Sequence, residues 1–350
     1  MLYYATFIPG LGELIAGLVR ERLPDAEIRL YDGAVLFETS VGYDRLNFLC
    51  FNNIFAVISL MDGPAAALET HIAAFIKTAA ADSAAKEIIS HNNRKLSTFR
   101  INIFRENKPA AVNEKLRTEA ERHIARISGL RANRSGGGAE FWFLYRDESG
   151  GSPFSVFMKR LTLRPSWEKS LHPGELPPPL AWMLCRLAQL KHDDTVLDPF
   201  CGYGSIPNAA LKFFHITKFT ACDNNEKAAA YTAARFRDRP VGTFTFYRTG
   251  FSSLVSMLPE KSVDAIITDP PWGYYDSGQE PQVELYKEMF GVFKTLLKET
   301  GRVVILGART DDLPRAAGDR FVMLKHTPIL LSGKKAAVYQ FALKNPVLKN

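Results

Sequence analysis

The run Asp269-Pro270-Pro271-Trp272 follows an apolar stretch that is typical of a buried strand. Two successive prolines predict an extended, rigid exit from the sheet, which would hold the Asp269 side chain and the Pro270 carbonyl in one geometry. Both groups accept hydrogen bonds, whereas the exocyclic amine of a nucleobase offers two donors, and Trp272 supplies a flat surface for stacking. We therefore predict that Asp269, Pro270 and Trp272 are catalytic and hold a base amine; the alternative is a proline-stiffened loop with a packed tryptophan.

A second motif runs from Asp198 to Gly204 and ends an earlier apolar stretch. Ligands bind at the carboxyl ends of parallel strands, and Gly202 and Gly204 permit close backbone approach there. A dinucleotide fingerprint needs a third glycine where this chain has Pro207, and the Asp198 carboxylate would repel a pyrophosphate. The motif therefore favours a ligand with a positive amino group over a nicotinamide dinucleotide, while a tight strand-to-helix turn without a ligand is the alternative.

A third motif, Asp223-Asn224-Asn225, ends the next apolar stretch, 25 residues after Asp198. This spacing suits a strand-helix-strand unit, in which a carboxylate at the second strand end can accept both hydroxyls of a ribose. Asp and Asn are also good helix N-caps, so a purely structural role is the alternative. The two roles are compatible if one residue binds ribose and a neighbour caps the helix.

A regular β/α alternation from residue 195 onward must position these motifs. We expect strands at 195–197, 219–222, 244–247, 263–268 and 302–306, helices at 205–213, 225–237 and 281–298, and a C-terminal hairpin of 320–330 and 336–343. Near-continuous apolar strands suit a parallel sheet that is covered on both faces. The expected fold class is therefore α/β, with a Rossmann-like C-terminal domain.

The N-terminal half mixes strand and helix patterns. We expect strands at 3–8, 34–37, 55–58, 98–103, 140–145 and 154–159, and helices at 10–23, 46–51, 64–81 and 113–127. The proline-rich stretch of residues 172–179 cannot continue a regular element and predicts the main domain boundary, with a helix at 180–190 after it.

Together, the three motifs resemble those of class I S-adenosylmethionine-dependent methyltransferases, and Asp-Pro-Pro-Trp resembles the subgroup that methylates exocyclic amines. The resemblance covers about residues 176–345. It implies S-adenosylmethionine as the cofactor, bound by Asp198, Phe200, Gly202, Gly204, Asp223 and Asn224. The family often holds the adenine amine with an acidic residue after the third strand, which this chain lacks, so Phe251, Ser252 or the backbone is expected to replace it.

Segments 98–101, 113–127, 140–143 and 158–162 resemble a THUMP domain, an RNA-binding module, and residues 1–63 resemble the ferredoxin-like domain of THUMP-containing tRNA guanine-N2 methyltransferases. The resemblance implies a ferredoxin-like domain at 1–63, a THUMP-like domain at 64–165, a linker at 166–179 and a methyltransferase domain at 180–350. It also implies contacts to the tRNA backbone from Arg100, Arg131, Arg134, Lys159, Arg160 and Arg164. Residues 86–165 hold 16 Lys and Arg against 8 Asp and Glu, which suits a polyanionic partner, although a solvated basic surface is the alternative.

The expected function is methyl transfer to the N2 amine of a guanosine in tRNA, with the acceptor-stem region preferred. Alternatives are methylation of adenine N6 in DNA, methylation of guanine N2 in rRNA, or RNA binding without catalysis. A protein partner is neither required nor excluded.

Other signals in the sequence are negative. The four cysteines share no zinc-site spacing, so we expect no metal and reduced thiols in the cytoplasm. The sequence contains no run of eighteen apolar residues, so we expect no membrane span. The start lacks the pattern of a secretory signal. His71, His123 and Cys201 are expected to have no chemical role.

Overall fold

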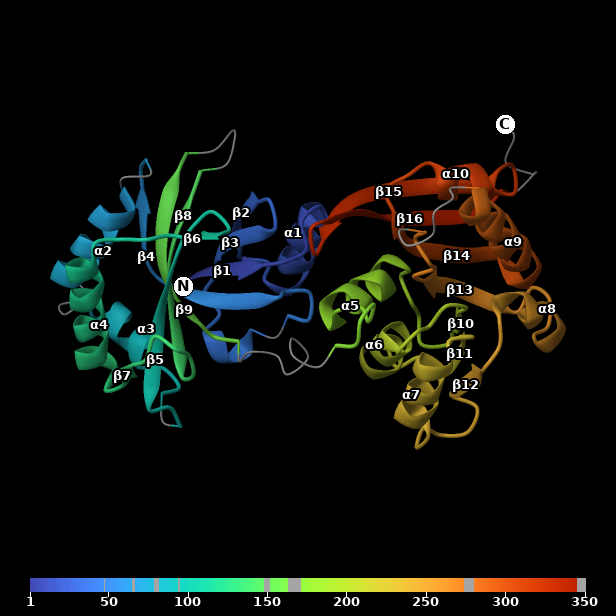
Figure 1. Cartoon of the computed structure of the whole chain (residues 1–350), viewed down its shortest axis with the longest axis horizontal. Coiled ribbons are helices and arrows are strands. Elements are labelled where there is room, and N and C mark those ends of the chain that lie inside the picture. The colour runs from blue at the N-terminus through green and yellow to red at the C-terminus, as the bar shows by residue number, and fades with distance from the viewer. Residues whose placement is uncertain are drawn as a thin grey trace. The chain divides into compact units, whose positions relative to one another are not determined.

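Two sheets organise the chain, one in each of two units (Figure 1). The computed structural model describes residues 1–46, 48–64, 67–78, 82–93, 95–147, 152–162, 171–273 and 280–344. The N-terminal unit comprises Met1–Phe7 and Leu11–Pro165, and the C-terminal unit comprises Ile8–Gly10 and Ser166–Asn350. None of the helices in these described ranges is both long enough and apolar enough to cross a membrane.

In the described part of the N-terminal unit, nine strands form one sheet in the order β2-β3-β1-β4-β9-β8-β5-β6, with β7 pairing with β5. The strands are β1 (Leu2–Thr6), β2 (Glu27–Tyr31), β3 (Ala34–Glu38), β4 (Asn53–Asp62), β5 (Thr98–Arg105), β6 (Lys108–Pro109), β7 (Arg131–Ala132), β8 (Ala139–Arg146) and β9 (Phe154–Arg160). Because β4 pairs with β9, the sheet is continuous across the region where we expect the ferredoxin-like and THUMP-like domains to meet. That division remains a prediction.

The helices of this unit are α1 (Gly12–Arg22), η1 (Tyr43–Arg45), α2 (Ala67–Thr78), α3 (Ser83–Ser90) and α4 (Glu114–Ser128). Side chains of α2, α3 and α4 share one core with β5, β8 and β9, in which Phe75, Phe143 and Phe157 are buried. Asp82 and Asn113 accept hydrogen bonds from backbone N–H groups at the starts of α3 and α4 and so cap both helices.

The sheet of the C-terminal unit has the order β12-β11-β10-β13-β14-β16-β15 in its described part. Its strands are β10 (Thr195–Asp198), β11 (Lys218–Cys222), β12 (Phe244–Tyr247), β13 (Val263–Thr268), β14 (Leu297–Ala308), β15 (Phe321–Leu331) and β16 (Lys334–Leu343). The first five are parallel, whereas β16 lies antiparallel between β14 and β15. The predicted Rossmann-like sheet and C-terminal hairpin are confirmed. The strand order reverses between β10 and β13, which is where such sheets bind ligands.

Helices cover both faces of this sheet, with α5, α6 and α7 on one side and α8, α9 and α10 on the other (Figure 1). They are α5 (Pro178–Leu187), α6 (Ser205–Phe213), α7 (Glu226–Phe236), η3 (Phe251–Ser253), α8 (Leu254–Met257), α9 (Glu280–Leu296) and α10 (Asp312–Ala317). Proline starts α5, where its missing N–H costs no helical hydrogen bond. Ile266 and Ile267 of β13 are fully buried, as expected for a strand covered on both sides.

Two expected elements differ from the structure. The helix expected at 46–51 is wrong, because no helix occurs among the described residues there. Phe48 and Phe51 instead contact each other and Phe37, so tertiary packing uses an apolar run that is too short to form a stable helix alone. The helix expected at 281–298 ends at Leu296, where β14 begins.

Candidate active site

The three motifs lie at the carboxyl ends of adjacent strands in the C-terminal unit. Asp198 ends β10 and pairs in register with Ala221 of β11. Thr268, the last residue of β13, donates its hydroxyl to Asp198 Oδ1 at 2.9 Å. The motifs that were recognised separately in the sequence therefore converge at one sheet edge, at the point where the strand order reverses.

Asp198 is fully buried and only partly satisfied. Its Oδ1 accepts hydrogen bonds from the Thr268 hydroxyl and from the Phe200 backbone N–H at 3.2 Å, whereas no described residue donates to Oδ2. Burial raises the pKa of Asp198 to about 8; these hydrogen bonds oppose the rise, and the carboxylates of Asp223 and Asp269 add to it. A cationic ligand at this position would supply the missing partner and offset the cost of the buried charge.

The turn after β10 requires its glycines for two different reasons. Gly204 has φ +79°, and a Cβ on it would lie 2.8 Å from the ring of Phe236. Gly202 has φ +49°, but a Cβ on it would meet no atom within 4 Å. The backbone at Gly202 is thus open on the side where a ligand could approach, while its carbonyl is held by the Thr232 hydroxyl at 2.8 Å.

Asp223 binds the glycine turn directly. Its Oδ2 accepts from the Gly202 backbone N–H at 2.7 Å, and its Oδ1 accepts from the Asn225 N–H at 2.8 Å. Asn225 caps α7 by accepting from Ala228 N–H, whereas Asn224 is exposed. Each carboxylate oxygen has two lone pairs, so Asp223 keeps acceptor capacity for hydroxyl groups.

The residues that follow β13 include a half-buried carboxylate, that of Asp269. Asp269 Oδ1 accepts a hydrogen bond from the indole N–H of Trp272 at 2.7 Å. Burial raises the pKa of Asp269 to about 7, and the bond from Trp272 opposes that rise. No described residue donates to the carbonyl of Pro270. One carboxylate oxygen and one carbonyl therefore remain as acceptors, and base stacking on Trp272 stays a prediction.

Residues of α9 hold the same loop, although no sequence motif pointed to them. Gln282 and Tyr286 both donate to the carbonyl of Pro271, the latter at 2.8 Å. The aromatic residues expected near an adenine lie together, because the rings of Phe200 and Phe251 are 5.0 Å apart. Ser252 is exposed in η3.

The thiols at the site are buried. Burial raises the pKa of Cys201 far above its usual range and that of Cys222 to about 12, so both remain protonated at neutral pH. Throughout the described ranges, no cluster of His, Cys, Asp and Glu is arranged to hold a metal ion.

Residues ahead of α5 clasp the glycine turn. Glu175 accepts hydrogen bonds from the hydroxyl of Ser205 at 3.4 Å and from the guanidinium of Arg235 at 3.3 Å, and that guanidinium also donates to the Tyr203 carbonyl at 3.0 Å. The His172 ring stacks on Tyr203 with a centroid distance of 4.2 Å. The described part of the predicted linker is therefore tied to the turn by side chains rather than by a regular element.

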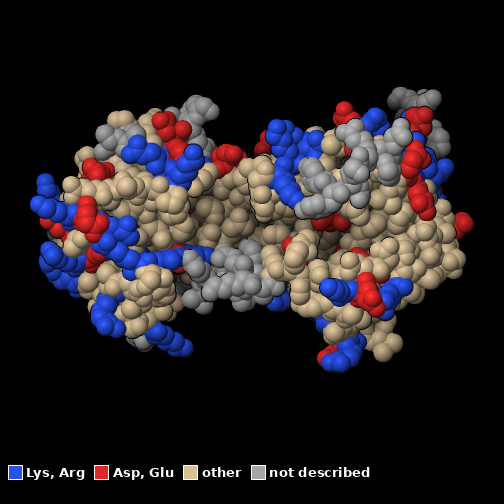
Figure 2. All heavy atoms as spheres, viewed as in Figure 1, with Lys and Arg blue, Asp and Glu red and all other residues tan. Residues whose placement is uncertain are grey.

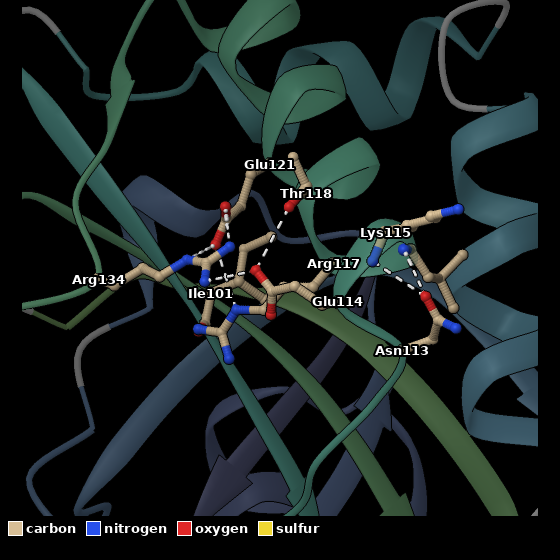
Figure 3. Close-up of polar contacts among 9 residues, drawn as sticks. Ile101, Asn113, Glu114, Lys115, Arg117, Thr118, Glu121 and Arg134 are labelled. Atoms are coloured by element: carbon tan, nitrogen blue, oxygen red, sulfur yellow. Dashed lines mark hydrogen bonds and ion pairs between the residues drawn. The ribbon is translucent and has the colours of Figure 1, made fainter.

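Basic side chains in the N-terminal unit differ in how accessible they are. Figure 2 shows Lys and Arg gathered over the part that carries α2 and α4, interspersed with acidic groups. Arg131 is exposed and pairs with no acidic side chain among the described residues. Arg134 lies between Glu121 and Glu114, each 2.8 Å away, and still exposes 45% of its side chain (Figure 3).

Two arginines and one lysine of the predicted set are engaged in the protein. Arg100 and Arg160 both pair with Glu140, at 2.7 and 3.4 Å. Lys159 is 4% exposed and donates to the carbonyls of Ile89 and His91 and to the Asn93 side chain. Its prediction as an RNA contact is corrected, because its ammonium is buried and fully used. Arg164 lies outside the described residues.

Comparisons with known proteins find methyltransferases. Residues 165–330 match the family described as UPF0020, RMKL-like, methyltransferase domain. The tRNA (guanine(10)-N2)-dimethyltransferase of Methanothermobacter thermautotrophicus is 31% identical over 160 residues, which are 45% of this chain and 46% of that protein. The tRNA (guanine(6)-N2)-methyltransferase of Thermus thermophilus is 32% identical over 178 residues, 50% and 52% of the two chains. The chain thus spans about half the length of the curated relatives that it matches.

Among solved structures, TrmN from Thermus thermophilus aligns with a TM-score of 0.81 at 23% identity, over 98% of this chain and 99% of that one. This likeness shows a shared fold along nearly the whole chain. The predicted α/β fold is therefore confirmed, as is the resemblance of the C-terminal half to a methyltransferase domain.

Proposed function

Starting from the methyltransferase domain at residues 165–330, we propose that this chain transfers a methyl group from S-adenosylmethionine to the exocyclic N2 amine of a guanosine in tRNA. The observation that carries the proposal is the buried Asp198 carboxylate, whose Oδ2 lacks a partner, on the strand next to the Asp269-Pro270 exit. One strand end offers an acceptor for a cationic cofactor, and its neighbour offers acceptors for an amine.

The residues at the glycine turn fit S-adenosylmethionine. This cofactor carries an ammonium and a sulfonium. Asp198 offers an unsatisfied acceptor, and two nearby carboxylates, Asp223 and Asp269, add to the negative charge around it. The open side of Gly202 admits the methionine part, and Asp223 retains lone pairs for the ribose. When bound, the cofactor supplies an electrophilic methyl group on sulfur. Phe200, Gly204 and Asn224 complete the proposed binding set, with Phe251 and Ser252 proposed to lie beside the adenine.

The loop after β13 is proposed to present the amine. The free oxygen of Asp269 and the carbonyl of Pro270 accept hydrogen bonds from the two N–H groups of the amine. These two bonds fix the direction of the nitrogen lone pair. The base is flipped out of its stack and rests on Trp272. Asp269 accepts more strongly when ionised, and burial raises its pKa to about 7, so we propose that it also takes the proton that the amine loses.

The RNA is proposed to bind the N-terminal unit. The names of the relatives support tRNA and guanine N2, and the basic residues 86–165 support a polyanion. We propose Arg131 and Arg134 as phosphate contacts, with Arg100, Arg160 and Arg164 as further candidates. We also propose that a ferredoxin-like domain ends at residue 63 and that a THUMP-like domain follows it. The four buried free thiols support a cytoplasmic location.

The test is methylation of unmodified tRNA by the purified chain, with nucleosides analysed by mass spectrometry. We expect N2-methylguanosine in the tRNA and no methylated nucleoside in duplex DNA. Asp269→Ala should lower turnover by about 1,000-fold while tRNA affinity stays within about two-fold, because it removes an acceptor that acts on the amine and not on the RNA backbone.

Mapping the modified nucleotide decides the finer assignment. The relatives act at guanine 6 and at guanine 10, and we propose the acceptor-stem region, which contains position 6. Modification confined to guanine 10 would refute that preference. Absence of any S-adenosylmethionine binding in a calorimetric titration would refute the proposed function as a whole.

A further inference from the structure

We propose that Tyr286 is a positioning residue that, together with Gln282, fixes the catalytic loop from helix α9. This inference rests on the proposed function, since it assigns a role to residues behind the Asp269-Pro270 exit. We call Gln282 and Tyr286 the α9 clamp.

The clamp consists of two donors on one acceptor. Tyr286 donates its hydroxyl to the carbonyl of Pro271 at 2.8 Å, and the side-chain amide of Gln282 donates to the same oxygen. Residues four positions apart share one face of a helix, so both donors point the same way. Tyr286 is 2% exposed and belongs to a core cluster with Met289 and Phe290, which holds its ring in place.

The loop needs such outside support because Pro270 and Pro271 have no N–H groups. It cannot tie itself down through backbone donors at these positions, so its carbonyls are the groups that a neighbour can hold. The clamp takes the Pro271 carbonyl and leaves the Pro270 carbonyl without a donor from the described residues. The Pro270 carbonyl, which we assign to the target amine, therefore stays available, while the neighbouring Pro271 carbonyl is fixed.

Gly273 extends the contact. Its φ is +72°, and a Cβ there would lie 3.0 Å from Oε1 of Gln282, so the chain passes close over the clamp. Burial also raises the pKa of Tyr286 to about 12, which keeps its hydroxyl a donor through the range in which the enzyme would work.

The test uses Tyr286→Phe, which deletes one hydroxyl and keeps the ring, and Gln282→Met, which deletes the amide. Tyr339→Phe is the matched control, because Tyr339 is buried in the same core and its hydroxyl donates to the carbonyls of Ala308 and Thr310 instead. The measurements are kcat, KM for tRNA and for S-adenosylmethionine, cofactor Kd by calorimetry, and the melting temperature.

We expect Tyr286→Phe to lower kcat about ten-fold and the double variant about a hundred-fold, because misplacement of the acceptors weakens alignment rather than binding. Cofactor Kd and both KM values should stay within about two-fold. Tyr339→Phe should keep kcat within about two-fold even if it melts at a lower temperature.

Wild-type kcat in folded Tyr286→Phe and Gln282→Met would overturn the inference, and so would an equal loss in Tyr339→Phe. If Tyr286→Phe does not fold, Gln282→Met alone decides by the same criterion. Hydrogen–deuterium exchange over residues 267–273 gives a reading that needs no turnover: it should quicken in the clamp variants and not in Tyr339→Phe. If wild type methylates no substrate, the proposed function is refuted. The exchange rates would still test whether the α9 clamp fixes the loop.

Discussion

At the scale of single residues, the site places a charge where folding disfavours it. Asp198 is fully buried with one oxygen unpartnered, and its pKa of about 8 lies well above the ordinary value of an aspartate. A carboxylate that is more easily protonated in the folded chain stabilises the fold below its unfolded pKa, near 4, and loses that contribution as the pH rises through 8. Function and stability therefore oppose each other at this position.

Replacing Asp198 by Asn tests this opposition. Without cofactor, the free energy of unfolding of Asp198→Asn should be about 1–2 kcal/mol larger than that of wild type at pH 8. The difference should shrink toward pH 5, because the Asp198 side chain of folded wild type is then protonated and uncharged. Its affinity for S-adenosylmethionine should fall more than ten-fold. Urea unfolding at both pH values and calorimetry measure the two effects.

Asp264→Asn is the control: burial acts to raise the pKa of Asp264, but its ion pair with Lys298 at 2.8 Å and the hydrogen bond from the Thr195 N–H outweigh burial and lower it. Its variant should lose stability at pH 8 and keep cofactor affinity. Undiminished cofactor binding by Asp198→Asn would contradict the role given to Asp198.

At the scale of elements, a buried lysine links β9 to the end of α3. Lys159 donates to the last carbonyls around α3 and to Asn93, and its ammonium lies 5.6 Å from the ring centre of Phe141. The lysine is 4% exposed and makes all three contacts within the protein, so it is part of the core in spite of its charge.

Lys159→Met should therefore lower the free energy of unfolding by about 2 kcal/mol, because it removes three hydrogen bonds made by a buried ammonium. Lys86→Met, on the exposed face of α3, should change it by less than about 0.5 kcal/mol. Chemical denaturation of both variants measures the difference. Equal stabilities would show that these hydrogen bonds contribute little.

The elements also show which features sequence patterns can predict. Strands β10, β11 and β13 were predicted because apolar runs and chemical motifs coincide in them. Strand β2 was not, because it is largely exposed and charged and lacks a buried face. Lys159 was misassigned for a related reason: its charge suggests the surface, and it is buried by residues at the end of α3, which lie far from it in the sequence.

The same limit applies to the site. Local motifs predict Asp198, Asp223 and Asp269, because each of them follows or ends an apolar run. Thr268 and Tyr286 act across the fold, 70 and 15 residues away from the groups that they hold, and no local pattern records such contacts.

At the scale of the whole molecule, charge is distributed unevenly along the chain. The net charge is +7, and residues 86–165 carry twice as many basic as acidic side chains. Binding of tRNA should release counterions, so the affinity should fall linearly with the logarithm of salt concentration.

Arg131→Ala should reduce the magnitude of that slope by about one, because one phosphate contact is lost. Cofactor affinity should not change, because the motifs that we propose to bind it lie in the other unit. Filter binding at several salt concentrations measures the slope. Lys287→Ala removes the same charge from the exposed side of α9 and should leave the slope unaltered; an identical change in both variants would mean that only overall charge matters.

The contacts of Glu175 and His172 with the glycine turn bear on where the methyltransferase domain can be joined to another chain. A chimera that joins a foreign N-terminal half to this methyltransferase domain at residue 179 would discard the side chains that contact Ser205, Arg235 and Tyr203. A junction before residue 171 would carry them along. What looks in sequence like a dispensable spacer behaves as the first piece of the domain that follows it.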